Sequence, residues 1–189
     1  MRGKVLIAAY PCSGTKFMAE LLKTYGISAM HEKSNEEVTV SWRHVGEPDK
    51  PGISKMEFDN VLHQVRHPLK ALASLGFGID DRSVQLFKHN CSGLGEPGLE
   101  FYMRVYLRWD ELIRELNPVL RYQLERVEYV WPEICKYVGL PVDTIYVDRG
   151  VPRNSHNSSN LILIWEDLEE VSPQMSEQLF GLARKYGYE

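Results

Sequence analysis

The residues best suited to chemistry lie at 10–17, which read Tyr-Pro-Cys-Ser-Gly-Thr-Lys-Phe. Gly14 allows the backbone to approach a ligand closely, while Ser13 and Thr15 supply hydroxyl donors. Lys16 adds a full positive charge, and the amides of these four residues can point at one anion at a helix N-terminus. The stretch therefore predicts a phosphate-binding loop between a strand and a helix.

The loop lacks one part of the phosphate loop of kinases and GTPases. That pattern ends in Gly-Lys followed by Ser or Thr, whose hydroxyl holds magnesium. Here Lys16 follows Thr15 and precedes Phe17, so the last hydroxyl is missing. The alternative interpretation is an ordinary strand-to-helix turn in which Ser and Thr cap the helix.

A second set of candidate phosphate ligands lies at 66–74. Arg66 follows a segment, 61–65, that we predict to be a central strand, and Pro68 suits the first turn of a helix. Ligands bind at the carboxyl ends of strands in open α/β sheets, so this position favours a phosphate contact. The forked guanidinium and the hydroxyl of Ser74 can enclose a phosphate together. A structural salt bridge and a solvent-facing hydroxyl are the alternatives.

Together, the two stretches resemble the sulfotransferases that use 3′-phosphoadenosine 5′-phosphosulfate (PAPS). Residues 10–17 are similar to the family's 5′-phosphosulfate loop, and residues 65–74 to its 3′-phosphate motif, Arg-Asp-Pro with a later Ser. Weaker similarities are 121–125, to the family's Tyr-Glu-Asp-Leu strand, and 180–188, to its terminal helix. The resemblance implies a three-layer α/β sandwich with a central parallel sheet, the P-loop-like sulfotransferase fold.

The resemblance also implies which residues contact PAPS. They are Cys12, Ser13, Gly14, Thr15, Lys16 and Phe17 in the loop, Arg66 and Ser74 in the second motif, and Arg153 in a late polar loop. Phe17 would stack on adenine or else belong to the core. Cys12 departs from the family, which has a Lys or Arg there in contact with the sulfonate, and His67 replaces an Asp or Asn. Lys16 is the candidate to supply the missing charge.

Three residues are candidates for the general base that sulfonate transfer needs. Glu32 is similar to a Glu base found after the second strand in several branches of the family, and His31 precedes it. His44 lies 22 residues before Arg66, a spacing similar to that of the His base in cytosolic members. A neutral imidazole has a suitable pKa, whereas a Glu needs burial to raise its pKa. We favour Glu32 narrowly, with His31 and His44 as alternatives.

The expected reaction moves a sulfonate from PAPS to a hydroxyl or amine and leaves adenosine 3′,5′-bisphosphate. Positioning and electrostatics supply most of such catalysis, so no metal is expected. The acceptor, a small molecule or a saccharide, would bind between segments 31–57 and 76–98. Two other functions remain open: a catalytically silent nucleotide-binding module, which Cys12 favours, and a small-molecule kinase with a degenerate phosphate loop.

Composition favours a single domain over residues 1–189. A chain of this length can bury one core, and its net charge of −4 does not favour nucleic-acid binding. No apolar run has the length of a membrane span, and the short apolar start leads straight into the loop, so we expect no membrane contact and no signal peptide. The three cysteines match no zinc pattern, and a cytoplasmic location is the simplest expectation. The sequence does not indicate an oligomeric state.

A sheet must position these residues. Apolar runs predict parallel strands at Lys4–Ala9, Ile27–Met30, Asn60–Val65 and Leu120–Leu124. Apolar periodicity predicts helices at 99–116, at 127–138 and from Pro173 onward. Residues 31–57 show little periodicity, and we expect a long excursion there.

Overall fold

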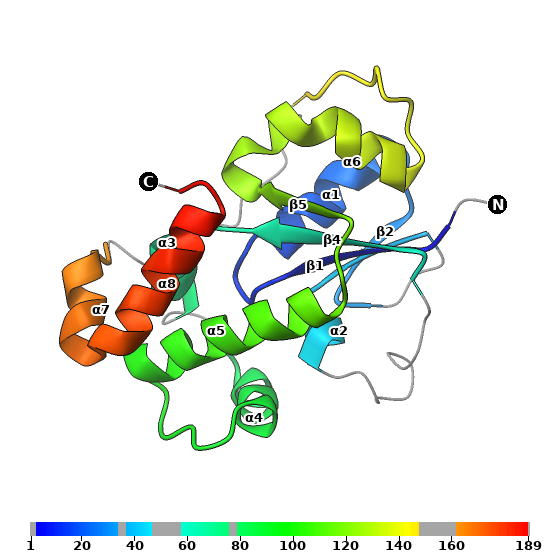
Figure 1. Ribbon diagram of the computed structural model, residues 1–189. Helices are drawn as coiled ribbons and strands as arrows, with labels where there is room; N and C mark the ends of the chain where they lie inside the picture. The colour runs from blue at the N-terminus through cyan, green and yellow to red at the C-terminus, as the bar shows by residue number, and fades with distance from the viewer. Residues whose placement is uncertain (1–2, 34–36, 47–57, 76–78, 148–161, 189) are drawn as a thin grey trace.

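The structure is a computed structural model that describes residues 3–33, 37–46, 58–75, 79–147 and 162–188 (Figure 1). Its strands are β1 (Val5–Ala9), β2 (Ala29–His31), β3 (Val38–Ser41), β4 (Asn60–Val65) and β5 (Leu120–Gln123). Its α-helices are α1 (Thr15–Thr24), α2 (Arg43–Gly46), α3 (Pro68–Leu75), α4 (Asp81–Asn90), α5 (Leu99–Glu115), α6 (Trp131–Val138), α7 (Trp165–Val171) and α8 (Pro173–Lys185). A 3₁₀ segment, η1 (Leu124–Val130), precedes α6.

The sheet contains five parallel strands in the order β2-β3-β1-β4-β5. The four predicted strands are present. The fifth, β3, was not predicted, and the expected excursion at 31–57 is wrong at this point. Val38 pairs with Val5 of β1 and with Ala29 of β2, so β3 is held from both sides. This strand has only four residues and two of them are polar, so its own apolar content gives little signal.

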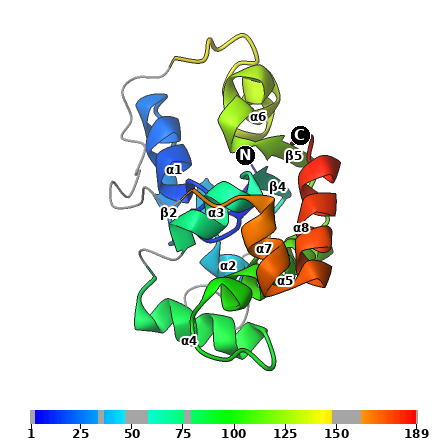
Figure 2. The same cartoon turned by 90° about the vertical axis from the view of Figure 1, so that its left-hand side faces the viewer.

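Helices cover both faces of the sheet (Figures 1 and 2). Leu6 and Ala8 of β1 belong to a core that contains residues of α3, α5 and α8. Val5 and Ile7 belong to a second core that contains residues of α1 and α6. Side chains alternate along a strand, so neighbouring residues of β1 enter opposite layers. The predicted α/β class with a central parallel sheet is confirmed, and the two cores agree with three layers.

The helix predicted at 127–138 begins later than expected. Pro132 has no amide hydrogen, so it fits the first turn of a helix and not its interior. The chain therefore forms η1 as far as Val130 and begins α6 at Trp131. Gly139, with φ 78°, ends this helix in the left-handed conformation that favours glycine.

The strand order places the ends of β1 and β4 at the centre of the sheet. From β1 the chain passes through α1 to β2 on one side, whereas from β4 it passes through α3, α4 and α5 to β5 on the other. The carboxyl ends of β1 and β4 therefore form a topological switch point, which is where ligands bind in open α/β sheets. Within the described ranges, no helix has both the length and the apolar content to cross a lipid bilayer.

Candidate functional site

The two sequence motifs meet in one cavity of about 550 Å³ at the carboxyl ends of β1 and β4. The predicted site residues that line it are Cys12, Gly14, Thr15, Lys16, Phe17, His31, Glu32, Arg66 and Ser74. Ser13 and His44 do not line it, and Arg153 lies outside the described residues. The structure thus brings together residues that the sequence placed on four separate elements.

Gly14 sets the shape of the loop between β1 and α1. Its φ is 77°, and a Cβ at this position would collide with the side chain of Leu124. Met18 N donates to Gly14 O at 3.1 Å, which begins α1. The amides of Gly14, Thr15 and Lys16 donate to no group in the described part of the chain. They are therefore free to donate to an anion at the N-terminus of α1.

Ser13 holds the turn together from inside. Its amide donates to Tyr10 O at 3.2 Å, and its carbonyl accepts from Gln64 Nε2 at 2.5 Å. Its hydroxyl is buried and has no hydrogen-bond partner among the described residues. The amide is engaged within the turn and is not turned toward the cavity.

Arg66 connects the loop to α3. Its Nη1 donates to Cys12 O at 2.6 Å and to Ser74 Oγ at 3.1 Å. Tyr106 Oη donates to the carbonyl of Arg66 at 2.9 Å, which fixes the backbone at this point. The predicted Arg–Ser pair therefore shares one wall of the cavity, next to the loop.

Cys12 supplies no charge at the loop position where the sulfotransferases carry a basic residue. Burial raises the pKa of its thiol to about 11, although the charge of Arg66 opposes the rise. The thiol is therefore protonated near neutral pH. The positive charges of the cavity come from Lys16, Arg43, Arg66 and Lys70.

His31 faces the loop from the end of β2. Its Nε2 lies 2.9 Å from Thr15 Oγ1 and 3.4 Å from Glu32 Oε1. Burial, followed by the positive charge of Lys16, holds the pKa of His31 below its ordinary value of 6.5. The imidazole is therefore neutral near pH 7 and can accept a proton.

The carboxylate of Glu32 caps the N-terminus of α2. Its Oε2 accepts from Ser41 Oγ at 2.6 Å and from Arg43 N at 3.1 Å, and its Oε1 accepts from Trp42 N at 3.2 Å. Burial raises the pKa of Glu32, and these hydrogen bonds oppose the rise. The residue also has a φ of 55°, which is rare for a side chain of this kind. Glu32 therefore has a structural role in holding α2, whatever it does in the cavity.

Two other candidates are occupied elsewhere. His44 is buried within α2, and its ring lies edge-on to Phe58 with centroids 6.1 Å apart. Phe17 is 6 % exposed and belongs to the core beneath α1, with only a part of it reaching the cavity. Its burial favours the core alternative over stacking on adenine.

Two cations of the cavity were missed by sequence reasoning. Arg43 Nη2 donates to Ser83 Oγ at 3.1 Å and lies 3.6 Å from Asp80 Oδ2. Lys70 lies on α3 four residues before Ser74, and this spacing on a helix was a signal that both share one face. Arg43 carried no such signal, because it follows the unpredicted strand β3.

The described residues contain no group of three or more His, Cys, Asp and Glu side chains arranged to hold a metal ion. No protein-family model matches the chain, and no curated protein matches it significantly. The functional interpretation therefore depends on the geometry and charge of this cavity.

Proposed function

We propose that the protein is a sulfotransferase that moves a sulfonate from PAPS to a hydroxyl or amine, on a P-loop-like sulfotransferase fold. The observation that carries this proposal is the Arg66–Ser74 pair, 3.1 Å apart, on the wall beside the anion loop. A 3′-phosphate distinguishes the PAPS nucleotide from ATP and AMP. A forked cation beside a hydroxyl suits such a phosphate.

The cavity divides naturally between two ligands. The free amides of the loop, with Thr15 and Lys16, would hold the 5′-phosphosulfate at the N-terminus of α1. The remainder of the lining includes Trp42, Arg43, Ile79, Asp80 and Ser83. These residues come from the two segments expected to form the acceptor site. His31 lines the same cavity, next to Thr15.

The residues have separate roles in the proposed reaction. Lys16 and the loop amides neutralise the charge that develops on the bridging oxygen as the sulfur–oxygen bond breaks. The electrons of that bond stay with the departing bisphosphate. His31 Nε2 accepts the proton of the acceptor as the acceptor oxygen or nitrogen bonds to sulfur. We assign the base to His31 in preference to Glu32, since the Glu32 carboxylate is held by three donors at α2.

A silent nucleotide-binding module is the second candidate, and the neutral thiol of Cys12 favours it. In this case the cavity would bind the nucleotide but lack a charge near the transferring group. Cys12→Lys tests this alternative, because in a silent module the restored charge would create transfer activity where the unmodified protein has none.

The proposed function is tested by incubating the protein with PAPS and panels of phenols, alcohols, amines and saccharides in the presence of EDTA. We expect adenosine 3′,5′-bisphosphate to form only with a suitable acceptor. Arg104→Ala, which removes an exposed cation of α5 outside the cavity lining, should leave the rate unchanged. Bound PAPS that no acceptor consumes would support the silent module. Stabilisation by ATP–magnesium in preference to the bisphosphate would support a kinase.

A further inference from the structure

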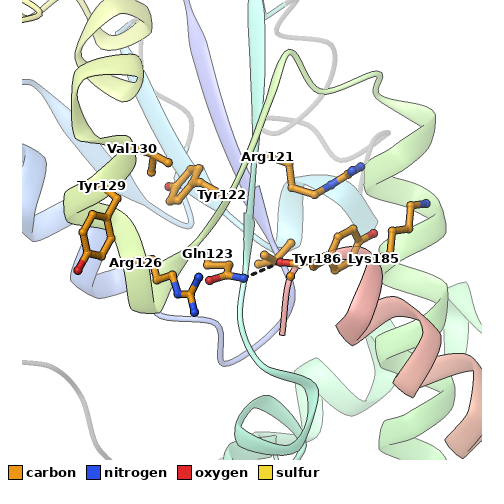
Figure 3. A pocket seen from close by; sticks show the side chains of 10 residues that line it. Arg121, Tyr122, Gln123, Arg126, Tyr129, Val130, Lys185 and Tyr186 are labelled. Atoms are coloured by element: carbon orange, nitrogen blue, oxygen red, sulfur yellow. Dashed lines mark hydrogen bonds between the residues drawn. The ribbon is translucent and has the colours of Figure 1, made fainter. Parts of the chain in front are cut away.

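A second and larger cavity, of about 760 Å³, lies along β5. Its lining includes Arg121, Gln123, Arg126, Tyr129, Lys185 and Tyr186 (Figure 3). None of the candidate site residues described above belongs to it. The cavity is therefore a separate feature that the proposed reaction does not use.

Strand β5 is the last strand of the sheet, and no strand among the described residues pairs with its outer edge. Val119 N, just before β5, donates to Val61 O at 2.8 Å. Asn60 N donates to Lys4 O of β1, so His63 and Val65, on the alternate positions of β4, face β5. His63 lies opposite Arg121, and in a parallel ladder its backbone pairs with the residues on either side, Leu120 and Tyr122. The backbone groups of Arg121 therefore face outward. The outward groups of Arg121 bond to no residue outside the sheet in the described ranges. An edge of this kind can pair with an added strand.

Three cations surround this edge without carboxylate partners. Arg121, Arg126 and Lys185 are exposed, and none forms an ion pair with a described carboxylate. Arg108 and Arg114, by contrast, are both paired with acidic side chains of α5. In a chain of net charge −4, this local excess of positive charge favours an acidic ligand.

Arg121 is held in a fixed orientation. Its Nε donates to His63 Nδ1 at 3.1 Å, and its guanidinium carbon lies 4.8 Å from the centre of the Tyr186 ring. Burial, and then the charge of Arg121, lowers the pKa of His63 to about 3, so this ring remains an acceptor at physiological pH. The terminal nitrogens of Arg121 bond to no described residue. They are therefore preorganised to bind a carboxylate.

The cations lie on both sides of β5. Figure 3 shows Arg121 and Lys185 with Tyr186 on one side of the strand, and Arg126 with Tyr129 on the other. Tyr129 is 78 % exposed and offers an aromatic surface at the rim. A single small anion would contact one side only. An extended peptide directs alternate side chains to opposite faces, so adjacent acidic residues would meet both groups of cations.

We propose that the β5 edge binds an acidic segment of a partner protein, which pairs with the outward backbone of Arg121 as an added strand. Its acidic side chains would contact Arg121 and Lys185 on one face and Arg126 on the other. The backbone would give affinity and the charges would give selectivity for acidic sequences.

The test uses a fluorescein-labelled peptide, Thr-Glu-Glu-Thr-Glu-Glu-Thr, acetylated and amidated, with binding followed by fluorescence anisotropy. We expect Arg126→Glu and Lys185→Glu each to weaken binding about fivefold or more. Arg184→Glu is the matched control, since it reverses an exposed charge next to Lys185 but lies outside the cavity lining. This variant should change the affinity less than about twofold. The same peptide with Lys in place of Glu should not bind.

Backbone pairing is tested separately. Methylation of alternate peptide nitrogens keeps the charges but removes donors, and we expect it to reduce affinity about tenfold. In the unmodified protein, peptide binding should protect the amide of Arg121 from hydrogen exchange. Equal binding of the methylated peptide would reduce the edge to a simple anion site and overturn the proposal. No binding of the acidic peptide at about 1 mM would also overturn it, and would leave the cations as protection of the edge against aggregation.

Discussion

The hydroxyl of Thr15 lies 2.9 Å from Nε2 of His31, which joins the anion loop to the end of β2. If Thr15 holds the phosphosulfate, this contact places a neutral imidazole next to the transferring sulfonate. It also places Lys16 near enough to lower the pKa of His31. The proposed catalytic groups are therefore electrostatically coupled before any ligand enters.

Substitution of each candidate base should show whether His31 or Glu32 accepts the proton. His31→Asn removes the proton acceptor, so we expect turnover to fall roughly 10²–10⁴-fold with little change in bisphosphate affinity. Glu32→Gln keeps an oxygen acceptor for the cap of α2 and should lower turnover less than about tenfold. His44→Asn should have no direct effect. A larger loss of turnover in Glu32→Gln than in His31→Asn would identify Glu32 as the base.

The pH profile of transfer gives an independent test of His31. Because the pKa of His31 is held below 6.5, its neutral form persists as the pH falls, and the acidic limb should lie below pH 6.5. Lys16→Met removes one of the charges that lower this pKa, so the limb should move upward. Lys23→Met also removes a cation, but this cation is paired with Glu20, so the acidic limb of this variant should move less. A limb that Lys16→Met leaves in place would contradict the coupling.

Lys16→Met should also slow transfer more than it weakens bisphosphate binding. The loss would lie in kcat, because the charge is needed most as the bridging oxygen becomes negative. Single-turnover rates and titrations with the bisphosphate measure the two effects. Equal losses in rate and binding would mean that Lys16 holds the ground state as much as the transition state.

Gly14→Ala should damage the loop through collision as well as backbone strain. The substituted Cβ would meet Leu124, and the φ of 77° adds roughly 1 kcal/mol of strain. Gly26→Ala is the matched control, with φ 79° but no atom within 4 Å of the added Cβ. Urea unfolding should show a larger destabilisation for Gly14→Ala, and Leu124→Ala should relieve part of it. Equal destabilisation of the two glycine variants would contradict the packing argument.

Part of this site could be predicted from the sequence. Arg66 follows a six-residue strand and Ser74 lies on the helix that Pro68 begins, so local patterns placed both on the same wall. The contact of His31 with Thr15 was not predictable in this way. It depends on β2 being held at the edge of the sheet by β3, a four-residue strand with a weak pattern. The cap that Glu32 forms on α2 depends on the same strand, since Ser41 ends it.

The buried His63 should make the unfolding free energy depend on pH. It is buried in β4 with its pKa lowered to about 3, whereas the unfolded chain has an ordinary value near 6.5. The unfolded state therefore binds more protons than the folded state between these two pKa values. The contribution of His63 to folding stability is present above pH 6.5 and is lost as the pH falls. Between pH 7.5 and 5, this group should cost about 2 kcal/mol of unfolding free energy. His63→Gln keeps an acceptor for Arg121 but does not titrate, so its urea curves should show a smaller pH dependence. An unchanged pH dependence would contradict a neutral buried His63.

The central claim is that Arg66 and Ser74 recognise a 3′-phosphate. Isothermal titration of adenosine 3′,5′-bisphosphate and of AMP, in EDTA, measures this recognition directly. The bisphosphate should bind more tightly, and Arg66→Ala should remove most of the difference, at a cost of about 1.5–3 kcal/mol for a charge-assisted contact. Arg104→Ala, an exposed cation of α5 outside the cavity lining, should leave the preference intact. Equal affinity of the unmodified protein for AMP and the bisphosphate would contradict the account.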